Sequence, residues 1–189
     1  MRHSKAVTKM RSFRLIALLA AVGSPAFVGS SAQAQAESNA VCSMVWKAYF
    51  SPGFTMTKGK GIYGTGVGMT GAETGLMTCA GTINGQRVTG PGTFGHKGET
   101  WDGNCFGNQG AGTYSYTIPT AGGVQHATGT YTESRGINQE GPVEARQPGA
   151  AFHGRHQVLP TGVVTSQEDC MSRPVTEVDA VMVGAFRTI

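Results

Sequence analysis

The stretch GTYSYTI at residues 112–118 has the alternation that is typical of a β-strand. Tyr114, Tyr116 and Ile118 fall on one face and hydroxyl side chains on the other, because successive side chains of a strand point to opposite faces of the sheet. Gly recurs every few residues over 49–135, and each would cost a helix roughly 1 kcal/mol. The sequence therefore predicts an all-β fold.

A Gly-Thr-aromatic triplet occurs three times, at residues 92–94, 112–114 and 129–131, with spacings of 20 and 17 residues. Two short strands and two turns take about that length, so we interpret each unit as one hairpin. Asn84-Gly85 gives the strongest tight-turn signal, and Gly122-Gly123 gives another.

The two ends of this region differ in pattern. Residues 40–50 are rich in apolar side chains; a strand and a short helix both fit this pattern, and we favour the strand. Residues 136–150 contain two Pro and three Gly, which predicts a long loop. Residues 175–189 alternate weakly and predict a closing strand. We expect a small antiparallel meander barrel; a two-sheet β-sandwich is the alternative, since both arrangements avoid long open edges.

Residues 1–36 have the layout of a secretory signal peptide. A basic segment without acids precedes an apolar run at 15–22, and Ala-x-Ala patterns follow at 32–36. The apolar run is shorter than the roughly 20 residues that a membrane-spanning helix needs. We therefore expect a periplasmic or secreted protein with one β-domain at 37–189.

The basic charge of the whole chain comes from this leader. Five of the 15 Lys and Arg residues and none of the 11 acids lie in the first 36 residues, so residues 37–189 carry a formal charge of −1. Binding to phosphates needs a clustered positive patch. We expect no nucleic-acid partner and no membrane span in the mature part.

Four cysteines, Cys42, Cys79, Cys105 and Cys170, follow the leader. In an exported chain they predict two disulfides, for which three pairings exist. We favour Cys79–Cys105, within the strand-rich region, and Cys42–Cys170, which would join the two ends. The alternative is a zinc site, but the sequence contains no C-x-x-C pair of the kind that binds zinc.

The Gly-x-Gly-x-aromatic rhythm of residues 61–132 resembles the small exported bacterial barrels related to allene oxide cyclase. The resemblance covers about half of the mature chain. It implies an antiparallel barrel with an apolar interior, and the plant members of that family act on a fatty-acid epoxide. No catalytic residue of the family matches a position here, so no site residue is carried over.

Large aromatic side chains are the candidate ligand-binding residues. Aromatic rings supply much of the contact area in pockets for apolar or sugar ligands. The alternative is that they fill the core of a small barrel. The candidates are Trp46, Trp101, Tyr114, Tyr116 and Tyr131.

Two ionisable clusters stand out as candidate metal or catalytic sites. His153 and His156 could act together only if Gly154 forms a bulge, because positions three apart on a strand face opposite sides. Residues 99–104 hold two carboxylates that could bind Ca²⁺. The alternative is a hairpin with Asp102-Gly103 at its tip and Trp101 covering the core. We expect no metal and no cofactor.

These observations favour a non-catalytic exported β-domain that binds a small apolar ligand or a protein partner. The alternative is a barrel enzyme of the isomerase or cyclase type, with Glu133, His126 and the His153/His156 pair as available acid-base groups. An interior without ionisable side chains would argue against the enzyme.

Overall fold

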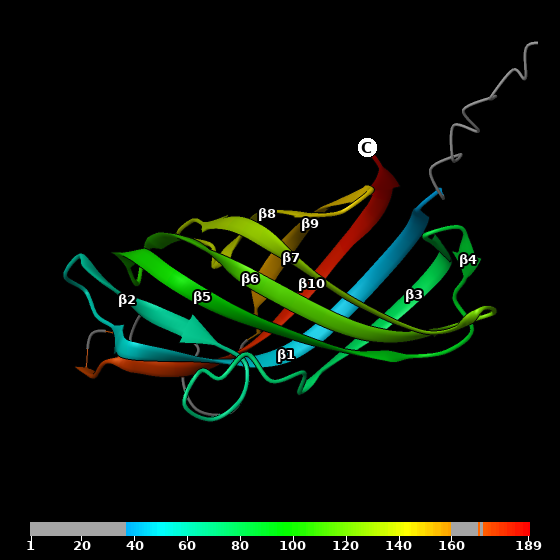
Figure 1. The fold of residues 1–189 in the computed structure, drawn as a ribbon. Coiled ribbons are helices and arrows are strands. Elements are labelled where there is room, and N and C mark those ends of the chain that lie inside the picture. Colours follow the sequence, from blue (N-terminus) through cyan, green and yellow to red (C-terminus); the bar gives the residue numbers. More distant parts are fainter. Residues whose placement is uncertain (1–36, 160–169, 171) are drawn as a thin grey trace, which may run out of the picture. The chain divides into compact units, whose positions relative to one another are not determined.

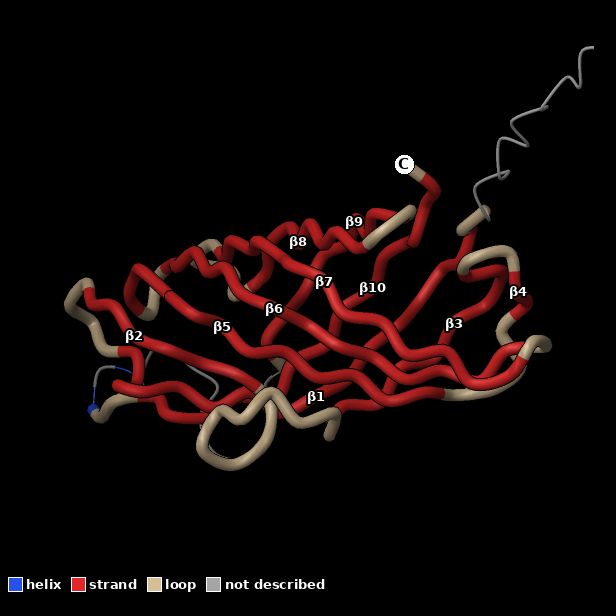
Figure 2. Tube along the Cα trace, viewed as in Figure 1, coloured by secondary structure: helices blue, strands red, loops and turns tan. Residues whose placement is uncertain are grey.

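The computed structural model describes residues 37–159, 170 and 172–189, and strands make up most of them (Figures 1 and 2). The signal-peptide prediction falls on residues 1–36, which lie outside the described residues. The strands are β1 (Asn39–Phe54), β2 (Gly59–Gly64), β3 (Gly75–Ile83), β4 (Gln86–Arg87), β5 (Gly92–Asn104), β6 (Gly107–Thr120), β7 (Gly123–Arg135), β8 (Glu140–Gln147), β9 (Ala150–Val158) and β10 (Val175–Thr188).

The sheet is an antiparallel meander that closes on itself. From β5 to β10 each strand pairs with the next along the chain, and β10 pairs with β1 from Asn39↔Arg187 to Tyr49↔Glu177. The hydrogen bonds thus form a ring of eight strands. The all-β fold and the barrel are confirmed, as are the strand over 40–50 and the closing strand at the end of the chain.

β2 and β3 together occupy one position in this ring. β3 lies between β1 and β5 at one end, whereas β2 lies between the same two strands at the other. The loop over 65–74 joins them and is the large tan loop in Figure 2. Thr65 ties this loop to β5, since its backbone N–H donates to the carbonyl of His96 and its hydroxyl accepts from the His96 N–H.

Alternation of buried and exposed residues places one face of the long strands inside the barrel, as β1 shows most clearly. In β1 the inward residues are Ala40, Cys42, Met44, Trp46 and Ala48, all buried. The residues between them point outward, which is the period of two expected for a strand with one buried face.

Glycines and aromatic residues face each other across the strands of the barrel wall. Tyr63 lies opposite Gly98, Tyr114 opposite Gly129 and Phe94 opposite Gly75. A Cβ on Gly98 would overlap the Tyr63 ring. The large rings therefore lie over backbone that carries no side chain, an arrangement known to compensate glycine in sheets.

These pairs explain the repeated triplet and correct its interpretation. The three triplets lie on three successive strands, β5, β6 and β7, so each unit contributes one strand and not one hairpin. Gly and the aromatic residue, two positions apart, share the inner face, while the Thr between them points outward. The Asn84-Gly85 turn is confirmed, with φ of 48° and 73°.

Two further predictions about turns and loops are wrong. Residues 136–150 are not a long loop, because β8 occupies Glu140–Gln147 and alternates between buried and exposed side chains. Asp102-Gly103 lies inside β5, and the hairpin tip is Cys105-Phe106. Pro148 lies in the turn after β8, and Pro142 precedes the segment Val143–Arg146 that pairs with β7, so its missing N–H removes no hydrogen bond of that pairing.

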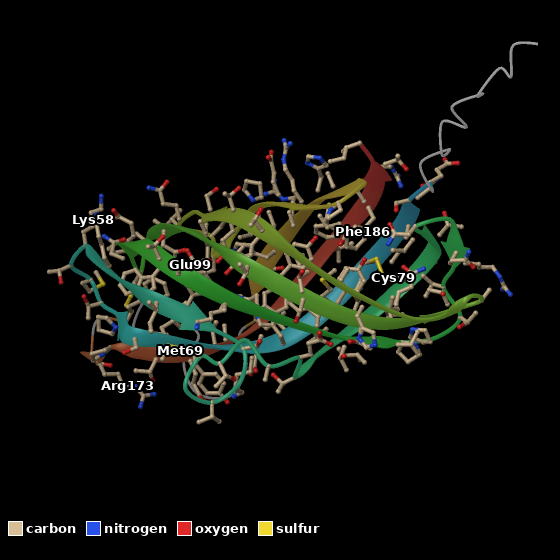
Figure 3. All side chains as sticks on the ribbon, viewed as in Figure 1. Lys58, Met69, Cys79, Glu99, Arg173 and Phe186 are labelled. Atoms are coloured by element: carbon tan, nitrogen blue, oxygen red, sulfur yellow. A yellow bond between two sulfur atoms is a disulfide. The ribbon has the colours of Figure 1, made fainter. Side chains whose placement is uncertain are left out.

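Both disulfides form, but their pairing differs from the one that the sequence favours. Cys42 pairs with Cys79, and Cys105 pairs with Cys170. Cys42 and Cys79 are register partners on β1 and β3, with Cα atoms 4.1 Å apart. Figure 3 shows this bond beside the label of Cys79. The sequence could not reveal that β3 returns directly beside β1.

Candidate ligand site in the barrel interior

Two small adjoining cavities lie inside the barrel, each of about 30 Å³. Trp46, His96 and Glu133 line both of them and so mark where they meet. One cavity is walled by apolar and aromatic side chains, namely Met44, Phe94, Tyr114, Tyr116, Tyr131, Val143, Ala145, Phe152, Met182 and Phe186. The other is more polar and is lined by Tyr63, Asn108, Arg135 and His156 together with apolar residues.

Strand periodicity brings the polar groups to this interior. Tyr131, Glu133 and Arg135 are alternate residues of β7 and share its inner face. His156 faces inward from β9 opposite Gly141 of β8. Its Nδ1 lies 3.4 Å from Glu133 Oε2, with 6% and 15% of the two side chains exposed. An acid and a base thus come into contact inside the barrel.

His96 occupies the junction from the side of β5. Its Nδ1 lies 3.1 Å from the Tyr131 hydroxyl, and its ring packs edge-on against Trp46 at 5.7 Å. Burial lowers the pKa of His96 to about 4, although Glu133 acts in the opposite direction. The imidazole is therefore neutral at neutral pH.

Arg135 closes the polar cavity beyond Glu133. Its guanidinium lies 5.1 Å above the Phe54 ring, and with the Asn108 amide oxygen turned toward it, Nε donates at 3.1 Å. Burial lowers its pKa to about 10, partly offset by Glu133. Arg135 thus keeps its positive charge at neutral pH beside the carboxylate.

Burial and the charge of Glu133 raise the pKa of the Tyr63 hydroxyl. For His156, burial lowers the pKa, and the charge of Glu133 acts in the opposite direction. Tyr63 therefore stays protonated and can donate a hydrogen bond, while His156 favours its neutral form at neutral pH.

Two buried polar atoms at this junction have no hydrogen-bond partner among the described residues. They are Trp46 Nε1 and His96 Nε2. Buried polar groups are nearly always hydrogen-bonded, so such orphans indicate a missing partner. Trp46 Nε1 can only donate, and therefore it needs an acceptor atom.

Three other polar side chains in the interior, in contrast, have hydrogen-bond partners. The Tyr114 hydroxyl donates to Gln147 Oε1 at 3.1 Å, and Gln147 Nε2 donates to the Tyr116 hydroxyl at 3.0 Å. Gln147 thus links Tyr114 and Tyr116, two residues that line the apolar cavity, through a chain of two hydrogen bonds.

Four of the five predicted aromatic residues line the cavities: Trp46, Tyr114, Tyr116 and Tyr131. The fifth, Trp101, is buried elsewhere, with its ring centroid 4.3 Å from that of Phe54.

Among the acid-base candidates, Glu133 and His156 come together inside. His126 lies on the outer face, where its Nδ1 is hydrogen-bonded to the Thr117 hydroxyl, and His153 is exposed. His153 and His156 do face opposite sides, so they form no joint site.

The carboxylate of Asp102 in the Ca²⁺ candidate pairs with Lys58 at 3.1 Å and with Lys60 at 3.4 Å. Within residues 37–159, 170 and 172–189, no three His, Cys, Asp or Glu side chains converge as a metal site requires. No helix in the same ranges is long and apolar enough to cross a membrane.

Sequence reasoning missed His96, Tyr63 and Arg135. The available signal was the strand period, because His96 follows Phe94 by two residues and Arg135 follows Glu133 by two.

Comparisons with protein-family models, curated proteins and solved structures find no match for this chain. The chemistry of the interior is therefore the basis for assigning a function.

Proposed function

We propose that the barrel binds a small ligand that has an apolar body and one oxygen that accepts hydrogen bonds. The observation that carries the proposal is the pair of unpartnered buried atoms at the junction, Trp46 Nε1 and His96 Nε2. A ligand oxygen placed there would supply the missing acceptor, while its apolar part would lie among Met44, Phe152 and their neighbours.

The two cavities together hold only a few water molecules, since a water needs roughly 10–15 Å³ of such space. A larger ligand requires side chains to move. Met44 and Met182 are register partners across β1 and β10, and both line the apolar cavity. Methionine is unbranched and adapts its shape readily, so these two residues provide the means of enlarging the cavity.

Cyclohexanone and cyclohexane are suitable probes, because they share a ring and differ in one carbonyl oxygen. We expect cyclohexanone to bind about tenfold more tightly, which corresponds to about one hydrogen bond. Ligand-observed NMR measures both affinities. Trp46→Phe should reduce the preference for the ketone, and Met182→Ala should raise the affinity for both probes.

Trp101→Phe is the matched control. Trp101 is also buried with an unpartnered Nε1 among the described residues, but it lines neither cavity. Its substitution should leave the preference for the ketone unchanged. Failure of both probes to bind the wild type and the Met182→Ala variant would overturn the proposal.

A protein partner is the second candidate. Four apolar residues point outward from neighbouring hydrogen-bonded strands: Val41 and Val45 on β1, Leu76 on β3 and Val183 on β10. Each of these residues is 44–55% exposed. Exposed apolar groups that lie together favour contact with another surface. A Val45→Glu variant should lose any self-association or partner binding seen by analytical ultracentrifugation, while binding of cyclohexanone stays unchanged.

A further inference from the structure

Glu133 is the one interior group at the junction that the proposed binding does not require. Its side chain lines both cavities, although it is only 15% exposed. Burying a carboxylate in a largely apolar interior costs free energy, which pairing and hydrogen bonds offset. The positive charge of Arg135 interacts favourably with the Glu133 carboxylate, and His156 Nδ1 lies 3.4 Å from one of its oxygens.

Trp46 offers complementary chemistry at the same junction. Its Nε1 is a donor without a partner among the described residues, and Trp46 lines both cavities together with Glu133. A base and a hydrogen-bond donor that line the same cavity are what the removal of a proton next to a carbonyl requires. The donor stabilises the oxygen that becomes negatively charged.

We infer that the barrel interior catalyses proton transfer at the carbon next to a ligand carbonyl, with Glu133 as the general base. This inference rests on the proposed binding function. A carboxylate oxygen of Glu133 takes the proton from the α-carbon. The electron pair of that C–H bond becomes the C=C bond of an enolate, and the C=O π electrons move to oxygen. Trp46 Nε1 donates a hydrogen bond to that oxygen.

Returning the proton to the same carbon regenerates the ketone, and returning it to a different carbon of a conjugated enolate gives an isomer. Neither outcome needs an oxidant, a reductant or a cofactor, since electrons and protons balance within the ligand and Glu133. The substrate class is therefore a small enolisable ketone or aldehyde with an apolar body.

Exchange of the α-hydrogens of cyclohexanone for deuterium in D₂O measures this step directly by NMR. The wild-type protein, with both disulfides intact, should accelerate the exchange well above the rate in buffer. Glu133→Gln should reduce the acceleration by at least about 100-fold, while cyclohexanone binding remains measurable. Glu144→Gln, an exposed residue on the outer face of β8, is the matched control and should exchange like the wild type.

If the wild type binds cyclohexanone without accelerating exchange, the catalytic inference is wrong and the binding function stands. If cyclohexanone does not bind at all, the binding proposal itself fails. Should Glu133→Gln not fold, Trp46→Phe replaces it, because it removes the donor and keeps an aromatic ring at the junction. That variant should slow the exchange, and an unchanged rate would overturn the inference.

Discussion

At the scale of single residues, the inward glycines decide how the interior is filled. A glycine on the inner face leaves room for the aromatic ring of the opposite strand, and the ring replaces the missing side chain. Tyr63 depends on two such positions, Gly98 and Gly110, since a Cβ at either would overlap the tyrosine. The position of the Tyr63 hydroxyl at the candidate site therefore depends on residues that carry no functional group.

Gly98→Ala should destabilise the protein by about 1–3 kcal/mol, the usual cost of overpacking a core. The added methyl group would displace the Tyr63 ring. Urea unfolding followed by circular dichroism measures the loss. Gly136→Ala is the control, because a Cβ there meets its nearest atom at 3.4 Å, an ordinary contact. Equal stability of the two variants would contradict the role assigned to Gly98.

At the scale of strands, the Cys42–Cys79 disulfide fixes β3 beside β1. It joins residues 37 apart in sequence. In the chain-entropy model, closing a loop of this length stabilises the folded state by about 4 kcal/mol. β2 and β3 share one position in the ring and are joined by the loop over residues 65–74. The disulfide therefore also fixes the half of that position that β3 occupies.

Replacing both Cys42 and Cys79 with Ala should therefore reduce the free energy of unfolding by up to about 4 kcal/mol. The barrel should still close, because β1 also pairs with β10 along most of its length. Chemical denaturation gives the stability, and far-ultraviolet circular dichroism reports whether the strands remain. Loss of all β-structure in the double variant would show that β10 pairing alone does not hold the ring.

The elements also show what the sequence could predict. Alternation at residues 112–118 and the Asn84-Gly85 turn are local signals, and both led to correct strands and turns. The strand β8 was missed because two Pro and three Gly outweighed a clear alternation around Val143 and Ala145. Disulfide pairing and the meeting of Glu133 with His156 depend on which strands become neighbours, and that is a property of the closed ring.

At the scale of the whole molecule, the buried imidazoles link stability to pH. In the unfolded chain His96 takes up a proton near its ordinary pKa of about 6.5, whereas in the barrel burial lowers that pKa to about 4. Above about pH 6.5 both states are neutral and His96 adds no pH dependence. Between the two values the unfolded state binds more protons, so stability falls as the pH falls. His156 is shifted in the same direction.

The free energy of unfolding should thus decrease between about pH 6.5 and about pH 4, by about 3 kcal/mol through His96. Urea titrations across this range measure it. His96→Gln should flatten the decrease, and His153→Gln, an exposed residue on β9, should leave it as in the wild type. An unchanged slope in His96→Gln would show that the decrease comes from other groups.

The pairing of β1 with β10 has a consequence for how the chain is made. β1 is completed early in synthesis, but its partner on one side comes more than a hundred residues later. Until then, the growing protein carries an open edge with unpaired N–H and C=O groups, which is a template for pairing with other chains. The closed barrel is thus the product of a late, long-range event, and the interval before it is when this protein is most exposed to misassembly.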